Sequence, residues 1–379
     1  MGRAMVDIRS RPTNTFPYDE FVAREGIPLF SAQVGVADVT QLPRDDWART
    51  GGRGTYIRLA GTFESERGIY VGEIPGGGAL NPEHHLYEEQ VFVLRGRGSA
   101  EVWQGSRDKL RFEWGEGSIF AFPRNTWHRL YNGTRDPVIF LGVTTAPAII
   151  NQLDDLEFVF GCDYQFGDIY AEAGEYFHAP DARTVEGWYS QTIWHTNFIP
   201  NVSAAAVDPL DRKIAGGLLT GYRMGRTFPH GHISQWPAGR YHKAHYHGPG
   251  AILLGLDGEG YVLAWPSSLG PHPYQAGHAD QVLRVDWGRH SIYSPPNAWF
   301  HQHFNSGAGP ARHVAVYGAM LPLGVHGMEE DQGWKGFKSI REGGTLIEHE
   351  DEDPQILADF ERMLAAKGLA SQMPSPARA

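Results

Sequence analysis

Two stretches of the chain alternate short apolar runs with turn residues, and both predict antiparallel β-structure. Between residues 51 and 150 the runs are TYIRLAG, GIYVGEI, QVFVLRG, SAEVWQG, SIFAF and PVIFLGVTT. Between residues 231 and 322 they are HISQWPAG, AILLGLDG, GYVLAWP, VLRVDWG, SIYSPP and RHVAVYGAM. Short runs rich in β-branched and aromatic residues, bounded by Gly, Pro, Asn and Asp, are typical of strands. The pattern therefore predicts an all-β fold with two β-domains.

The other segments are less regular. Residues 1–50 show no clear period and are expected to form an N-terminal arm with a few short elements. Residues 151–230 are rich in aromatic and turn residues and are expected to pack between the two domains. In the tail, residues 323–379, the stretch DEDPQILADFERMLAAKG predicts a helix over about 354–367, because Asp353 suits the N-cap and Gly368 the position after the end.

The second β-domain repeats the first. A shift of 162 residues superimposes four pairs: His247 on His85, Gly258 on Gly96, His245 on Glu83 and Ala251 on Glu89. Further along, residues 117–132 (GSIFAFPRNTWHRLYN) match residues 288–305 (GRHSIYSPPNAWFHQHFN). An internal repeat of this length indicates two copies of one fold.

These motifs resemble those of the cupin superfamily, and in particular of bicupins. The usual first motif contains His-x-His, a later Glu and a Gly, and the usual second motif contains Pro-x-Gly, then His and Asn. The matching residues of the second half are Gly239, His245, His247, Gly258, Pro296, His301 and Asn305. Those of the first half are His85, Glu89, Gly96, Gly117, Pro123, His128 and Asn132. The resemblance implies two jelly-roll (double-stranded β-helix) barrels, each with a metal site in its mouth, over roughly 50–150 and 230–322.

Three histidines of the second half are the expected ligands of a metal ion. His245 and His247 occupy alternate positions of an expected strand and so face the same side, while Tyr246 faces away. By the resemblance, His301 completes the set from a later strand. Neutral imidazole suits Fe(II), Zn, Cu and Ni. His242 and His303 are expected either to support these ligands or to lie at the surface.

The second half departs from the usual motif, because Ala251 stands where the glutamate is expected. Three neutral ligands leave an ion its full charge and open positions, which suits an anionic, chelating substrate with O2 bound beside it. This set resembles that of gentisate-type ring-cleaving dioxygenases and thiol dioxygenases, which hold non-haem Fe(II) on three histidines. Fe(II) is the expected ion, with Mn(II), Ni(II), Cu(II) and Zn(II) as alternatives. The opposite interpretation is a degenerate cupin that has lost its metal.

The first half departs differently, because its His-x-His position reads Glu83-His84-His85. Glu83, His85, Glu89 and His128 are the candidate ligands of a second site. Two carboxylates and two imidazoles suit Mn(II) or Fe(II). Two alternatives stay open: a bulged strand in which His84 takes part, or a vestigial barrel kept for packing and dimerisation.

Four further residues are candidates for binding the substrate. Trp265 and Trp299 are expected to line an apolar pocket for a flat molecule. Arg240 precedes the ligand segment and Arg312 follows the second motif, and either guanidinium could hold a substrate carboxylate.

Composition narrows the class of protein. The 379 residues carry a formal net charge of −11 and no basic cluster, which argues against a nucleic-acid partner. No apolar run is long enough to span a bilayer, the N-terminus lacks a signal-peptide pattern, and the single cysteine, Cys162, fits a reducing compartment. We expect a cytoplasmic protein that acts on a small molecule and O2 as a homo-oligomer, a dimer or tetramer as bicupins commonly are.

Three functions follow from these observations. The first is a non-haem Fe(II) dioxygenase acting on a small anionic substrate, a hydroxylated aromatic or a carboxylate. The second is a non-catalytic bicupin that binds a small molecule or regulates a partner. The third is a metal-dependent isomerase or lyase. Chemistry of the oxalate decarboxylase type is less expected, because those bicupins usually keep three histidines and one glutamate in each barrel.

Overall fold

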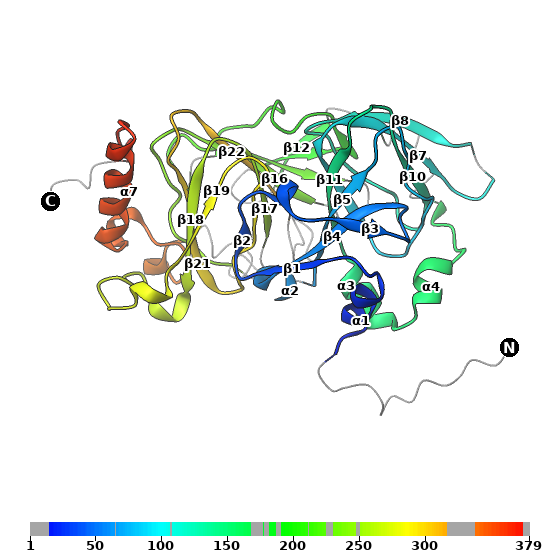
Figure 1. Cartoon of the computed structure of the whole chain (residues 1–379). Coiled ribbons are helices and arrows are strands. Elements are labelled where there is room, and N and C mark those ends of the chain that lie inside the picture. Colours follow the sequence, from blue (N-terminus) through cyan, green and yellow to red (C-terminus); the bar gives the residue numbers. More distant parts are fainter. Residues whose placement is uncertain are drawn as a thin grey trace.

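Four sheets form two β-barrels that lie side by side (Figure 1). The computed structural model describes residues 15–64, 66–106, 108–167, 177, 182–186, 191–210, 212–224, 230–247, 251–316 and 338–373. Each barrel combines one eight-stranded sheet with one three-stranded sheet. The predicted fold class, all-β with two jelly-roll barrels and a C-terminal helix, is confirmed.

The first barrel follows the order of a jelly roll. Its large sheet runs β1 (Leu29–Ala32), β4 (Gly52–Leu59), β5 (Gly68–Ile74), β11 (Val138–Thr144), β6 (Glu89–Arg95), β9 (Ile119–Ala121) and β14 (Phe198–Ile199), with β3 (Asp45–Trp47) beside β4. Its small sheet runs β10 (Trp127–Asn132), β7 (Arg97–Trp103) and β8 (Leu110–Gly115).

The second barrel has the same plan. Its large sheet runs β12 (Ala182–Glu186), β13 (Gln191–His195), β15 (Leu218–Arg223), β16 (His230–Trp236), β22 (Ala311–Val316), β17 (Ile252–Asp257), β20 (Ile292–Tyr293) and β2 (Gly35–Val36). Its small sheet runs β19 (Leu283–Trp287), β18 (Gly260–Pro266) and β21 (Trp299–Asn305).

The duplication extends to single backbone irregularities. The β6–β11 ladder shifts register beside Arg95, and the β17–β22 ladder shifts at the equivalent Asp257. Directly after each shift stands a glycine with positive φ, Gly96 at +89° and Gly258 at +86°. A Cβ would lie 2.7 Å from Val138 Cγ2 at Gly96 and 2.9 Å from Ala311 Cα at Gly258. Both positions therefore require glycine, for its conformation and for the space.

The barrels exchange strands at their edges. β2, from the expected N-terminal arm, pairs with β20 of the second barrel, while β1 and β3 of the same arm join the first. β14, from the expected inter-domain segment, pairs with β9 of the first barrel. One apolar cluster contains buried residues of both barrels, for example Ile57, Leu141, Ile252 and Val314. The two large sheets thus share a core, and segments outside the two repeats cover sheet edges that would otherwise be open.

Helices cover the two outer ends of the molecule (Figure 1). α1 (Pro17–Arg24), α3 (Ala146–Leu153) and α4 (Leu156–Gly161) lie beside the first barrel, and the short α2 (Ala60–Glu64) follows β4. The helix expected near residue 354 is α7 (Pro354–Ala366), and the Asp353 carboxylate caps it by accepting from Gln355 N at 3.1 Å. Its buried Phe360 packs on Tyr241 and Phe304 of the small sheet.

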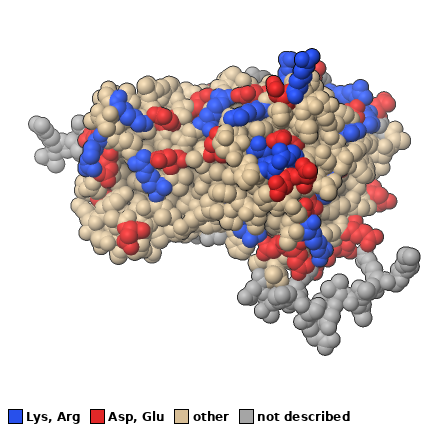
Figure 2. All heavy atoms as spheres, in the orientation of Figure 1, with Lys and Arg blue, Asp and Glu red and all other residues tan. Residues whose placement is uncertain are grey.

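The surface charge and the hydropathy of the helices do not point to a particular binding partner. On the face shown in Figure 2, acidic and basic side chains are interspersed over both barrels. Among the described residues, no helix is long and apolar enough to cross a membrane.

Candidate metal centres

In each barrel, ligands of the candidate centre belong to an extended segment that pairs with a strand of the small sheet. The pairing contains the same backbone irregularity in both barrels. The bridges are Ala79–Tyr131 and Glu83–His128 in the first barrel, and Tyr241–Phe304 and His245–His301 in the second. In each barrel the extended segment has one more residue between its bridges than the strand has, which is a β-bulge. The segments that carry the ligands are therefore bulged, which the sequence leaves open for the first barrel, whereas it predicts a regular strand in the second.

The second barrel brings together the three predicted histidines. One ring nitrogen each of His245, His247 and His301 lies within 4.8 Å of the other two. Nδ1 of His245 is 3.0 Å from the carbonyl oxygen of Lys243, and Nδ1 of His301 is 3.1 Å from that of Trp299. Because a carbonyl only accepts, both Nδ1 atoms carry the proton, and the lone pair of Nε2 is left for an ion.

The surroundings keep these imidazoles neutral. Burial lowers the pKa of His245 and His301 well below the usual value, and neighbouring positive groups act in the same direction. Ala251, at the position of the usual glutamate, is buried and offers no carboxylate. An ion in this group would thus be held by neutral ligands, which are the form that binds metals.

A lysine that the sequence did not single out reaches this group. Lys213 Nζ lies 2.8 Å from His245 Nε2. Burial lowers the pKa of the amine to about 7. Lys213 precedes β15 in the irregular stretch between the repeats, where the sequence offers no motif that would point to it.

A second set of imidazoles lies beside the three histidines. His242, His303 and His313 are all buried, and the ring of His303 is 5.5 Å from that of His301. The hydroxyl of Tyr293, which is fully buried, lies 3.1 Å from Nδ1 of His303 and 3.1 Å from Nδ1 of His313. Because the hydroxyl has one proton, it donates to one Nδ1 and accepts from the other. His242 and His303 are therefore interior residues, while the sequence left open that they lie at the surface.

The first barrel brings together two imidazoles and one carboxylate. Ligand atoms of His85, Glu89 and His128 lie within 4.8 Å of one another. Glu89 Oε2 is 3.2 Å from His85 Nε2 and 3.9 Å from His128 Nε2. Nδ1 of the two histidines is held by the carbonyls of Tyr87 at 2.8 Å and Thr126 at 3.1 Å. His128 Nε2 is a buried nitrogen with no hydrogen-bond partner, as expected of a ligand to an ion.

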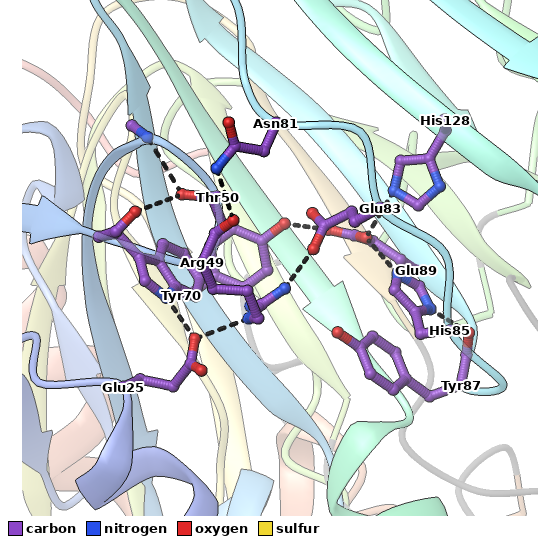
Figure 3. A network of polar contacts seen from close by, with 12 residues as sticks. Glu25, Arg49, Thr50, Tyr70, Asn81, Glu83, His85, Tyr87, Glu89 and His128 are labelled. Carbon is purple, nitrogen blue, oxygen red and sulfur yellow. Dashed lines mark hydrogen bonds and ion pairs between the residues drawn. The ribbon is translucent and has the colours of Figure 1, made fainter. Parts of the chain in front are cut away.

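The carboxylate of this group is fixed by a tyrosine. The Tyr70 hydroxyl donates to Glu89 Oε1, which leaves Oε2 facing the histidines (Figure 3). Burial alone would raise the pKa of Glu89, but the hydrogen bond with His85, the charges of the two histidines and the Tyr70 hydroxyl together lower it to about 2. The group thus presents a carboxylate and two imidazoles, the donor set of non-haem iron sites with open positions.

Glu83 and His84 are not part of this group. The carboxylate of Glu83 forms an ion pair with Arg49, which also binds Glu25 at 2.7 Å (Figure 3). His84 turns away, stacking on Trp127 at 4.1 Å with its Nε2 3.2 Å from the Cys162 carbonyl oxygen. The expected four-ligand set is therefore corrected to three, and the bulge does not bring His84 inward.

Aromatic rings close the first group. Tyr87 stacks on His85 with 3.6 Å between the ring centroids, and Phe122 stacks on His128 with 4.0 Å between the ring centroids. A cavity of about 10 Å³ lies against Glu89, His128 and Tyr70. The space beside this group is about that of one water molecule.

Two of the four residues expected to bind substrate are buried and form hydrogen bonds within the protein. Trp265 is fully buried and donates to the Gly270 carbonyl at 3.0 Å, within the core covered by α7. The buried guanidinium of Arg312 donates to three main-chain carbonyls, of Val202, Ser203 and Ala205. Both side chains hold the structure together, since their polar atoms are used within the protein.

The other two stay untested as substrate ligands. Arg240 Nη1 donates to the Ala215 carbonyl at 2.7 Å. Trp299 is partly buried at the start of β21, two residues before His301. The carbonyl oxygen of Trp299 accepts a hydrogen bond from Nδ1 of His301. Of the two predicted tryptophans, Trp299 is therefore the one whose backbone contacts a histidine of the three-histidine group.

Comparison with known proteins supports the class of fold. Residues 70–144, within the first barrel, match the family model of the cupin domain. No curated protein matches the chain.

Solved structures of two-barrel proteins are similar to the chain. A variant of oxalate decarboxylase from Bacillus subtilis is 12% identical with a TM-score of 0.48, and the match covers 77% of this chain and 78% of that chain. A second variant of that enzyme is 11% identical with a TM-score of 0.49 over 76% and 78%. The coconut allergen cocosin is 12% identical with a TM-score of 0.48 over 76% and 86%. Identities this low say nothing of activity.

Proposed function

We propose that the chain is a metal-dependent dioxygenase for a small anionic substrate, with Fe(II) held by His245, His247 and His301. The observation that carries the proposal is the convergence of three imidazole nitrogens within 4.8 Å in one barrel. Carbonyl contacts fix two of the rings in the tautomer that leaves Nε2 available, and no carboxylate of the described residues belongs to the group.

The bound ion would supply a Lewis acid and a route for electrons between an anionic substrate and O2. The part of the chain is to hold the ligands and to leave positive charge uncompensated. Neutral histidines do not reduce the charge of a bound ion. An ion on three histidines therefore attracts an anionic substrate more strongly than an ion held partly by a carboxylate does. A hydroxylated aromatic carboxylate is the substrate class suggested by the resemblance to gentisate-type enzymes.

The test is O2 uptake by iron-loaded protein, purified without air, against a panel of hydroxylated aromatic carboxylates. We expect O2 consumption with a panel member, and its loss in His247→Ala together with loss of iron from one site. The matched control is His278→Ala, which removes a partly exposed histidine whose Nδ1 lies 3.3 Å from the Gln281 amide. Substrate turnover that proceeds equally without O2, or survives in His247→Ala, would contradict the proposal.

The first barrel supports a second candidate, a metal-dependent lyase or isomerase. The specific observation is that ligand atoms of His85, Glu89 and His128 lie within 4.8 Å of one another, with a small cavity beside Glu89 and His128. The carboxylate lowers the net charge of a bound divalent ion, and an ion that only polarises a carbonyl needs no O2. Activity on a small carboxylate that persists without O2, and disappears in His128→Ala but not in His247→Ala, would favour this function. Ligand binding without any turnover would favour a binding protein instead.

A further inference from the structure

Lys213 and a metal ion compete for the same atom of the second barrel. Since His245 Nδ1 is protonated toward the Lys243 carbonyl, His245 Nε2 is an acceptor, and Lys213 Nζ donates to it across 2.8 Å. A metal ion bound to imidazole lies about 2.0–2.2 Å from the nitrogen, along that same lone pair. The amine and the ion cannot both occupy this position, because one lone pair serves one partner.

The backbone around Lys213 keeps the lysine beside the site. The Lys213 carbonyl accepts from Lys243 N at 2.9 Å, which ties it to the segment that carries His245. The turn that follows is closed by Gly217 N donating to the Ile214 carbonyl at 3.0 Å. The four-carbon stem is flexible while this backbone stays fixed, so a displaced amine stays within a few ångströms of the ion.

Glu348, an acidic residue of this region, is paired with two cations. Glu348 accepts from Arg212 at 3.0 Å and from Lys243. The segment of residues 345–347 in turn pairs with residues 244–246, with Ile347 N donating to the Ala244 carbonyl at 2.8 Å. Glu348 thus pairs with two basic residues near the site, while the metal group among the described residues consists of His245, His247 and His301.

We propose that Lys213 is a displaceable member of the second-barrel site, which withdraws from His245 when a metal ion binds and then anchors an anionic group of the ion's substrate. The proposal rests on the proposed function, since it assumes that His245, His247 and His301 hold an ion. It assigns the substrate class: a small molecule with two anionic groups, one placed toward the ion and the other toward the ammonium. Ion and ammonium together favour such a dianion over a monoanion.

The first experiment measures metal affinity without any substrate. Co(II) is titrated into the full chain carrying His128→Ala, which removes the first-barrel site, and binding is followed by equilibrium dialysis and visible absorption. Adding Lys213→Met removes the competing amine at nearly constant volume. We expect at least tenfold tighter Co(II) binding in Lys213→Met, and an affinity close to that of the parent in Lys213→Arg, because a guanidinium also donates to His245. Equal or weaker binding in Lys213→Met would overturn the displacement.

The second experiment measures the anchor on the same Co(II)-loaded proteins. Malonate, a dianion, and acetate, a monoanion, are titrated while the Co(II) spectrum is recorded. We expect Lys213→Met to weaken malonate binding at least tenfold and to change acetate binding less than threefold. An equal change for both anions would overturn the role of Lys213 as an anchor.

A third variant separates failure of this proposal from failure of the proposed function. Adding His247→Ala to the His128→Ala chain must abolish Co(II) binding if the three histidines are the ligands. If it does not, the proposed metal site is wrong, and the proposal for Lys213 falls with it. If the background fails to fold, as judged by its thermal transition, His128→Gln replaces His128→Ala.

Discussion

Tyr293 offers a sharp test of the imidazole set beside the three-histidine group. Tyr293→Phe removes one hydroxyl from a side chain that is 0% exposed and leaves the ring in place. Two contacts of 3.1 Å disappear, to Nδ1 of His303 and Nδ1 of His313. A buried hydrogen bond contributes about 0.5–1.5 kcal/mol, and a buried polar atom left without a partner costs about 1–3 kcal/mol. Since two nitrogens lose their partner, we expect a loss of about 2–4 kcal/mol in the free energy of unfolding.

The assay is urea unfolding followed by tryptophan fluorescence at pH 7.5, comparing midpoints at an unchanged slope. The matched control is Tyr131→Phe, which removes a hydroxyl that contacts Glu101 at 2.9 Å in a partly exposed position. We expect the control to lose less than about 1 kcal/mol, because water replaces the lost contact. A loss below about 0.5 kcal/mol in Tyr293→Phe would refute the reasoning, since the hydroxyl would then bridge neither histidine.

Three further predictions concern the first barrel, pH and the C-terminal helix. Tyr70→Phe frees Glu89 Oε1, so we expect metal affinity of the first barrel to fall about 10–100-fold in equilibrium dialysis. Burial lowers the pKa of His313 to about 3. Below about pH 6.5 the unfolded chain therefore binds more protons than the folded chain, so the free energy of unfolding falls as the pH decreases, by at most about 1.4 kcal/mol per pH unit from this residue. Urea unfolding of His313→Gln should lack this contribution of His313 to the pH dependence. Phe360→Ala should cost about 3–5 kcal/mol in the same assay, because the ring is fully buried, and the partly buried Leu357→Ala clearly less.

The sequence predicted the features that belong to the repeated motifs and missed contacts made by residues outside these motifs. Strand alternation and the repeated motifs were sufficient to predict two barrels and to select His245, His247, His301, His85 and His128, because both copies place ligands at fixed positions. The pairing of Glu83 with Arg49 could not be predicted, since Arg49 belongs to a segment without any period. Trp265 failed as a pocket residue because α7 buries the face of the sheet on which it lies.

The residues that support the ligands carry no motif of their own. His313 lies in RHVAV, where strand alternation could have suggested an inward imidazole, but nothing in the sequence links it to Tyr293. Lys213 is in an irregular stretch and reaches His245 only through the tertiary fold. Sequence patterns therefore identify ligands, while the groups that set the charge around them depend on how the segments between the repeats pack.

The two barrels differ at two equivalent positions, and the differences would give a bound ion a different charge in each. Where the first barrel has Glu83 and Glu89, the second has His245 and Ala251. Glu83 is paired with Arg49, so Glu89 is the one carboxylate of the first group, on which aromatic rings stack. The second group has no carboxylate and has an amine at one of its nitrogens. A divalent ion would thus have a net charge near +1 in the first barrel and +2 in the second, with an ammonium nearby. Since attraction of an anion grows with that charge, the anionic substrate is expected in the second barrel and not in the first.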